Sequence, residues 1–140
     1  KFVAGFIGSP SMNFIDVTLQ ADGGRLFAVT PGFRMLVPDA TGRALERYIG
    51  QTVTMGIRPE HLVERSRLAG NVPSDMSIPV TVDVIELLGN EIFVYLANNG
   101  TMLTARMDPT VKLTRGEKIE VSTEPDKLHF FDPVTEDAIR

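Results

Sequence analysis

The chain has 140 residues, of which 43% are hydrophobic and 23% charged, and it contains no cysteine. This composition is typical of one ordinary globular domain or of two small barrels that share strands, and it excludes disulfides, thiolate metal sites and cysteine nucleophiles. The formal net charge of -4 argues against a nucleic-acid partner, because phosphates need a basic face.

The first ten residues predict the end of a helix. Four apolar side chains have helical spacing there, namely Phe2, Val3, Phe6 and Ile7. Pro10 lacks an amide donor and disfavours helical geometry at Ser9, so we expect the helix to stop at this point. Because the chain begins with Lys1 rather than methionine, residues 1–10 are interpreted as the remnant of a connecting helix from a longer protein.

Residues 11–65 are interpreted as a first β subdomain. Apolar and polar side chains alternate over residues 15–20, which is the period of a strand with one wet face. The glycine-containing turn at residues 21–24 leads into a second strand over residues 26–30, so the pattern predicts a hairpin.

A single short helix is expected between Pro38 and Gly50, because one face of this stretch is apolar and the other charged. Thr41 is a candidate N-cap, and Gly50 is a candidate end of the helix. Alternation resumes over residues 53–57 and predicts a strand that runs into the sequence Arg-Pro-Glu-His at residues 58–61. A helix that plugs one end of a barrel would fit this pattern.

Residues 66–77 are typical of a loop that links two halves, and residues 78–133 predict a second β subdomain before a tail at residues 134–140. Five short strands are expected in the second half, over residues 78–84, 92–96, 102–107, 119–123 and 128–131. Short strands with frequent turn signals favour a small closed or sandwich-like barrel. The predicted fold class is therefore mainly β, with two packed subdomains that can share strands and one short helix.

Four segments carry a resemblance to a known family. They are residues 1–14, with the phrase Phe-Ile-Gly-Ser-Pro-Ser-Met-Asn, residues 55–62, with Gly-Ile-Arg-Pro-Glu-His-Leu, and residues 88–91 and 128–132. Together they resemble the carboxy-terminal region of the ATP-binding subunits of maltose-type ABC importers, which carry sugars or glycerol 3-phosphate. The resemblance implies small transport-associated oligonucleotide-binding (TOBE, OB) barrels of the TOBE/MOP-like type.

The implied function is that of a non-catalytic regulatory and dimerisation domain, which holds two ATPase subunits together and can receive a regulatory protein. The phosphate loop Gly-x-x-x-x-Gly-Lys-Ser/Thr does not occur in the sequence, so we expect no enzymatic activity and no cofactor here, with ATP and Mg bound by the parent protein. The implied partners are a second tail and, through the ATPase domain, membrane-spanning importer subunits. The implied location is cytoplasmic, at the inner face of the cell membrane, and the lack of cysteine fits it.

Arg58, Glu60 and His61 are the first candidate contact residues, because they lie within a segment that carries the resemblance. Pro59 has a fixed φ and no amide donor, so the charged side chains beside it are presented from a stiff corner at a strand end. A rigid corner can dock a partner with little loss of entropy. An internal ion pair that stabilises the turn is the alternative, and the residues alone leave both open.

Asn90 and Glu91 are the second candidate contact residues. The stretch at residues 88–91 is a turn signal between two predicted strands. It is interpreted either as a plain hairpin turn or as a turn that also offers Glu91 to a partner.

Metal and enzyme functions have little support in the sequence. The two histidines, His61 and His129, are too few for a histidine-rich metal site, and no nucleophile elbow or placed carboxylate pair stands out. A barrel that senses a small ligand, an oxyanion or a sugar, is the alternative function, because related barrels bind such ligands where they meet. A nucleic-acid-binding OB fold is disfavoured by the acidic balance and the scarcity of aromatic residues.

Overall fold

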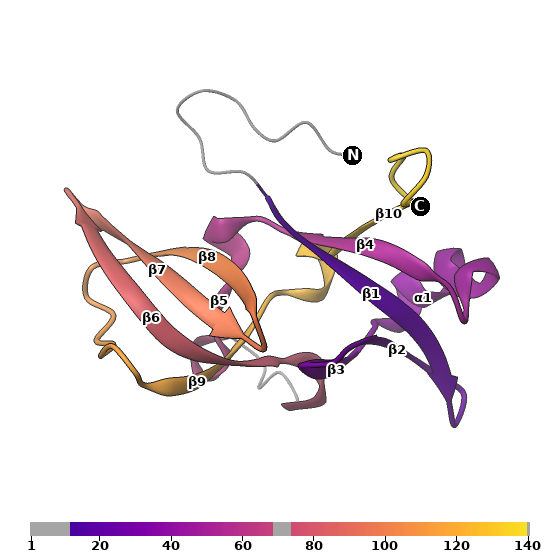
Figure 1. Cartoon of the computed structure of the whole chain (residues 1–140), viewed down its shortest axis with the longest axis horizontal. Helices are drawn as coiled ribbons and strands as arrows, with labels where there is room; N and C mark the ends of the chain where they lie inside the picture. Colours follow the sequence, from indigo (N-terminus) through magenta and orange to yellow (C-terminus); the bar gives the residue numbers. More distant parts are fainter. Residues whose placement is uncertain (1–11, 69–73, 140) are drawn as a thin grey trace.

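The computed structural model describes residues 12–68 and 74–139, and its strands form two antiparallel sheets (Figure 1). One α-helix and five short 3-10 helices accompany the ten strands of the described residues. The prediction of a mainly β chain with one short helix is thereby confirmed. The predicted helix remnant at residues 1–10 lies outside the described residues.

The first sheet has five strands in the spatial order β10-β4-β1-β2-β3. Their bounds are β1 Asn13–Asp22, β2 Arg25–Thr30, β3 Phe33–Leu36, β4 Thr52–Ile57 and β10 His129–Phe131. The helix α1 (Asp39–Leu45) and the 3-10 helix η1 (Glu46–Tyr48) lie between β3 and β4 in the chain. Leu45 is fully buried, so the helix packs against the core of this sheet.

The second sheet has five strands in the order β5-β9-β6-β7-β8. Their bounds are β5 Val63–Glu64, β6 Ile78–Leu88, β7 Glu91–Asn98, β8 Thr101–Met107 and β9 Lys118–Ser122. The remaining 3-10 helices are η2 Pro59–His61, η3 Arg65–Arg67, η4 Ser74–Met76 and η5 Pro125–Lys127. Thus η3 and η4 occupy parts of the stretch that the sequence analysis interpreted as a plain linking loop.

Each half of the chain contributes a strand to the sheet of the other half. β5 follows β4 in the chain but pairs with β9, with Val63 opposite Ser122. β10 comes from the second half but pairs with β4, with Phe130 opposite Met55. The sequence analysis placed residues 128–131 in the second subdomain, whereas the structure puts β10 in the first sheet and β5 in the second.

A single hydrophobic cluster unites the two sheets. Fully buried members from the first sheet are Leu19, Val53 and Met55, and those from the second sheet are Val94, Leu96 and Val121. Because the cluster contains Phe130 of β10 and Leu62, which directly precedes β5, the two halves share one core.

The predicted hairpin turns are confirmed. Gly23 and Gly24 have φ of 61° and 79°, and Asn99 and Gly100 have φ of 46° and 86°. Two consecutive residues with positive φ match the right-handed twist of the flanking strands, and glycine and asparagine tolerate that geometry. The β1–β2 and β7–β8 hairpins therefore follow from local sequence.

Two details differ from the sequence-based expectation. α1 begins at Asp39, with Pro38 at the N-cap and no side-chain cap, so Thr41 lies inside the helix and the predicted cap is wrong. Pro38 is already fixed at a φ of -59°, close to the helical value, which lets the helix start without a capping hydroxyl. The strand β3 was not predicted, because four residues are too few to show a period.

Candidate partner-contact site

Residues 58–61 form a corner that is anchored from within. Pro59 is buried at the first position of η2, and the His61 amide donates a hydrogen bond of 2.9 Å to the Arg58 carbonyl oxygen. Arg58 and Glu60 are exposed on either side of Pro59, and no ion pair joins them in the described part of the chain. The buried ring therefore fixes the corner while both charged side chains face solvent.

His61 differs from its two charged neighbours. Its side chain is half-buried, and its Nδ1 atom is buried without a hydrogen-bond partner among the described residues. This nitrogen is therefore not accessible to a partner at the surface. Of the three predicted contact residues in the corner, Arg58 and Glu60 are fully exposed, whereas His61 is half-buried.

Asn90 and Glu91 lie at the other predicted contact. Asn90 is exposed in the two-residue turn between β6 and β7, next to Gly89 with a φ of 62°. Glu91 is the first residue of β7, and its Oε1 atom lies 3.7 Å from Nε of Arg106 on β8. The structure thus confirms the turn geometry and pairs Glu91 loosely with a neighbouring strand.

The strand β8 lies between the two predicted groups. The 3-10 helix η2, which carries Glu60 and His61, packs against β8. Glu91 faces Arg106 on the same strand. No hydrogen bond or ion pair joins the corner to Asn90 or Glu91 within residues 12–68 and 74–139, so the groups are neighbours of one strand rather than one cluster.

Tyr95 and Glu86 form a polar contact close to this strand. The Tyr95 hydroxyl donates a hydrogen bond of 3.0 Å to Oε1 of Glu86. This hydrogen bond, together with partial desolvation and the negative charge of Glu86, raises the pKa of Tyr95 above its ordinary value. The tyrosine is therefore a neutral donor throughout the physiological range.

Asn13 is a structural residue that the sequence analysis did not single out. Its Nδ2 group donates hydrogen bonds to the carbonyl oxygens of Ile57 and Thr104, at 3.1 and 2.9 Å, and its Oδ1 atom accepts one of 2.8 Å from the Thr104 amide. The side-chain amide therefore pairs with both backbone groups of Thr104, as a neighbouring strand would, and covers the edge of β8 there. Its place in the phrase Ser-Met-Asn, which carries the family resemblance, is the signal that could have identified it.

Asn98 makes a second connection between the two sheets. Its Nδ2 group donates to the carbonyl oxygens of Gly32, in the β2–β3 turn, and Pro79, on β6, at 3.2 and 2.7 Å. A Cβ atom at Gly32 would collide with Oδ1 of Asn98, so this close approach requires glycine. Nothing in the local sequence indicates this long-range contact.

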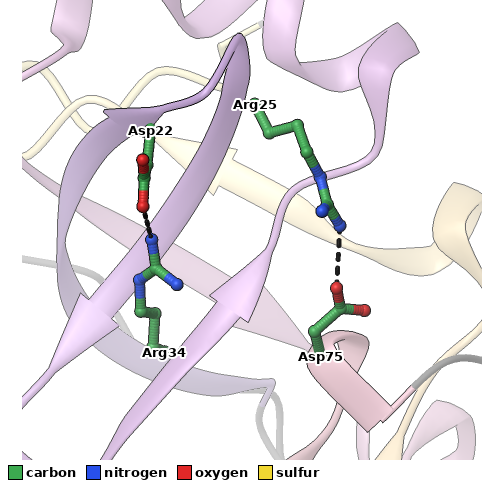
Figure 2. A network of polar contacts seen from close by, with 4 residues as sticks. All are labelled: Asp22, Arg25, Arg34 and Asp75. Atoms are coloured by element: carbon green, nitrogen blue, oxygen red, sulfur yellow. Dashed lines mark hydrogen bonds and ion pairs between the residues drawn. The ribbon is translucent and has the colours of Figure 1, made fainter.

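Two ion pairs tie β2 and β3 to their neighbours (Figure 2). Nη2 of Arg34 lies 2.7 Å from Oδ2 of Asp22, while the guanidinium group lies 3.7 Å from the centroid of the Phe27 ring. Nη2 of Arg25 lies 2.7 Å from Oδ2 of Asp75, which belongs to η4. All four charged side chains are substantially exposed, so these pairs orient the β1–β2 hairpin and contribute little to stability.

A cavity of about 510 Å³ lies between α1, η5, β10 and the C-terminal segment. Its lining is mostly apolar and includes Pro38, Ala44, Leu128, Phe130 and Ile139. No group of three or more potential metal ligands occurs among the described residues. In the same part of the chain, no helix has the length and apolar character required to cross a bilayer.

Comparisons with known proteins match the whole chain. The family model of the MalK OB fold domain matches residues 8–62, and the TOBE domain model matches residues 55–131. The multiple sugar-binding transport ATP-binding protein MsmK of Streptococcus mutans is 40% identical over 100% of this chain and 37% of its own length. The sn-glycerol-3-phosphate import ATP-binding protein UgpC of Paracoccus denitrificans is 36% identical over 96% of this chain and 34% of its own length.

Among solved structures, the cytoplasmic molybdate-binding protein ModG, crystallised with molybdate bound, aligns with a TM-score of 0.61. The alignment covers 91% of this chain and 99% of that chain at 17% identity, which shows a shared fold alone. The chain spans a little over a third of the length of the curated relatives described above. The family model that covers residues 55–131, more than half of the sequence, shows that the chain belongs to the TOBE domain family and confirms the resemblance to importer ATP-binding subunits.

Proposed function

We propose that the chain is a non-catalytic regulatory and dimerisation domain of the ATP-binding subunit of an ABC importer for sugars or glycerol 3-phosphate. The observation that carries the proposal is the match of the whole chain to ATP-binding subunits of importers for such substrates. In the parent protein, ATP and Mg would be bound by the ATPase domain and not by this chain. The parent would be cytoplasmic and would bind membrane-spanning importer subunits at the inner face of the cell membrane.

The mechanism would be a bias on the equilibrium between open and closed ATPase dimers. The shared core makes the two sheets one rigid unit, so contact between two tails can hold two subunits together while the motor domains move. A regulatory protein that docks on the tail changes the equilibrium only if it binds one state better than the other. Arg58, Glu60, His61, Asn90 and Glu91 are the proposed contacts, of which Arg58, Glu60 and Asn90 are exposed and His61 and Glu91 half-buried.

Sedimentation equilibrium of the chain over a range of concentrations tests the proposal. We expect a reversible monomer–dimer equilibrium. The double variant Arg58→Ala with Glu60→Ala should weaken it without lowering the melting temperature, because both side chains face solvent. A strictly monomeric chain would contradict the dimerisation role, and loss of folding in the double variant would assign the two residues to the turn instead.

The second candidate function is a small-ligand sensor for an oxyanion or a sugar. The cavity beside α1 favours it, because its volume of about 510 Å³ lies within the range of ligand pockets. The fold shared with the molybdate-binding protein ModG is compatible with it. Thermal unfolding with molybdate, phosphate or maltose added separately tests this candidate: a concentration-dependent rise in melting temperature supports it, and unchanged melting with all three ligands counts against it.

A further inference from the structure

Four asparagines occur among the described residues, and their side-chain amides are held to different degrees. Asn13 and Asn98 are held in place, because each donates hydrogen bonds to two backbone carbonyl oxygens. Asn90 and Asn99 are exposed in two-residue hairpin turns, and neither side chain has a hydrogen-bond partner within residues 12–68 and 74–139. The amide groups of these two side chains are therefore open to reaction in solvent.

The residue that follows in the chain distinguishes Asn99 from Asn90. Asn99 and Gly100 are the two central residues of the turn that joins β7 to β8, with φ of 46° and 86°. Gly100 has no side chain to shield its amide nitrogen, and a Cβ atom built there would meet nothing within 4 Å. Asn90 is followed instead by Glu91, whose side chain lies beside its own amide nitrogen. Only at Asn99 does an accessible side-chain amide therefore precede an unshielded backbone nitrogen in the described part of the chain.

We propose that Asn99 is a site of spontaneous deamidation, a covalent modification that needs water alone as co-reactant. In the first step, the amide nitrogen of Gly100 attacks Cγ of Asn99. The new N–Cγ bond closes a five-membered succinimide ring, the Cγ–Nδ2 bond breaks, and the NH2 group leaves as ammonia with the proton lost by the Gly100 amide. Water then opens the ring, so one amide and one water are consumed for one carboxylic acid and one ammonia.

Ring opening yields two products that differ in their backbone. Cleavage of the bond to Cγ restores the normal main chain and leaves an aspartate at position 99. Cleavage of the bond to the main-chain carbonyl carbon leaves an isoaspartate, whose main chain runs through Cβ and Cγ and is one atom longer. Asp-Gly suits this turn as well as Asn-Gly does, because both tolerate positive φ, whereas a longer main chain cannot keep the two-residue geometry.

The surroundings of the turn make the isoaspartate product disruptive. Cβ of Asn99 lies against Gly32 of the β2–β3 turn, since a Cβ atom built on Gly32 would be only 2.8 Å from it. The adjacent Asn98 donates the hydrogen bonds to the carbonyl oxygens of Gly32 and Pro79, at 3.2 and 2.7 Å, that join the two sheets here. An extra main-chain atom at position 99 displaces Asn98 from these carbonyl oxygens, so the link between the sheets is lost in the modified molecule.

Ageing of the purified chain in mildly alkaline buffer, followed by mass spectrometry, tests the site. Deamidation adds about 1 Da, and protease cleavage after Glu91 puts Asn90 and Asn99 on different peptides. We expect the mass gain on the peptide that begins at Ile92, with isoaspartate as well as aspartate at position 99, whereas the same peptide of the Asn99→Asp variant should keep its mass. An unchanged mass of the wild-type peptide, or an equal gain at Asn90, would overturn the proposal.

Melting temperatures test the structural consequence. The isoaspartate form, purified from the aged sample, should melt below the fresh protein, as Gly32→Ala should, because both changes disturb the hydrogen bonds of Asn98. Asn99→Asp carries the same new charge on a normal main chain at an exposed position, so it should melt as the wild type does. Equal melting of the isoaspartate form and the fresh protein would overturn the proposed loss of the link, and an equal loss in Asn99→Asp would assign the effect to the charge instead of the longer main chain.

Discussion

Asn13 shows how a single side chain can replace a missing strand. Its amide pairs with one backbone carbonyl on β4 and with both backbone groups of Thr104 on β8. Asn13→Ala should lower the free energy of unfolding by about 1–3 kcal/mol, because partly buried backbone groups lose their partner. Asn13→Asp should cost at least as much, since a carboxylate oxygen would then face two carbonyl oxygens.

Urea unfolding measures both effects. Gln20→Ala, at an exposed position on the same strand, is the control and should stay within about 0.5 kcal/mol of the wild type. An Asn13→Asp variant with wild-type stability would show that only the bond from the Thr104 amide matters.

Two glycines offer a matched pair of substitutions with opposite expected signs. Gly32→Ala would drive a methyl group into Asn98 and break its hydrogen bonds to Gly32 and Pro79, so it should destabilise the protein by about 1–3 kcal/mol. Gly42 lies inside α1, and a Cβ there would meet only Leu26 Cδ2 at 3.8 Å. Gly42→Ala should therefore stabilise by about 0.5–1 kcal/mol, because alanine is the better helix former. Thermal unfolding of the two variants in parallel checks both signs, and destabilisation by both would contradict the open space around Gly42.

At the scale of elements, the Asp132 carboxylate helps to hold the C-terminal segment, beside backbone hydrogen bonds such as that from the Ile139 amide to the Phe130 carbonyl oxygen. Oδ1 of Asp132 accepts hydrogen bonds from the amides of Val134 and Thr135, at 2.8 and 3.0 Å, and Oδ2 accepts one of 2.8 Å from the Tyr48 hydroxyl. The bond from Thr135 and then that from Val134, followed by Tyr48, lower the pKa of Asp132 below its ordinary value of 3.8. The ionised carboxylate therefore favours the docked segment.

The lowered pKa of Asp132 determines how the stability of the docked C-terminal segment depends on pH. Because the pKa is lower in the folded state, the contribution of Asp132 is fully present above its unfolded pKa near 3.8 and is lost as the pH falls through the lower, folded pKa. Amide chemical shifts of Val134 and Thr135 should titrate below pH 3.8, and the Asp132→Asn variant should lack that titration. Titration at or above the ordinary value would contradict the hydrogen-bonded geometry.

Elements with strong local signals could be predicted from the sequence. The β1–β2 and β7–β8 hairpins follow from turn residues that tolerate positive φ. The short helix follows from one apolar face, although α1 ends at Leu45 and η1 at Tyr48, before the predicted end at Gly50. The strand β3 could not be predicted, because its stability comes from pairing with β2 and from Arg34 lying over Phe27. Local periodicity carries no information about such a contact.

At the scale of the whole molecule, the exchange of β5 and β10 could not be derived from periodicity either. A strand of two or three residues shows that it is extended but not which sheet it joins. Val63 pairs with Ser122 and Phe130 with Met55, and both partners are distant in sequence. The surroundings of the candidate contact residues could not be derived from the sequence either. The motif predicted Arg58 and Glu60 at a corner, but it could not show that Pro59 is buried between them while both charged side chains face solvent.

The exchanged strands predict that neither half unfolds alone. Phe130→Ala removes a side chain that is 2% exposed on β10, and it should destabilise the protein by about 3–5 kcal/mol. The chain has two tyrosines and no tryptophan, with Tyr48 beside the first sheet and Tyr95 in the second, so Tyr95→Phe and Tyr48→Phe each leave one fluorescent reporter. In both backgrounds, Phe130→Ala should lower the urea midpoint by the same amount, although Phe130 lies in the first sheet. A smaller shift at Tyr95 than at Tyr48 would mean that the second sheet is stable without the first and that the shared core does not make the halves one cooperative unit.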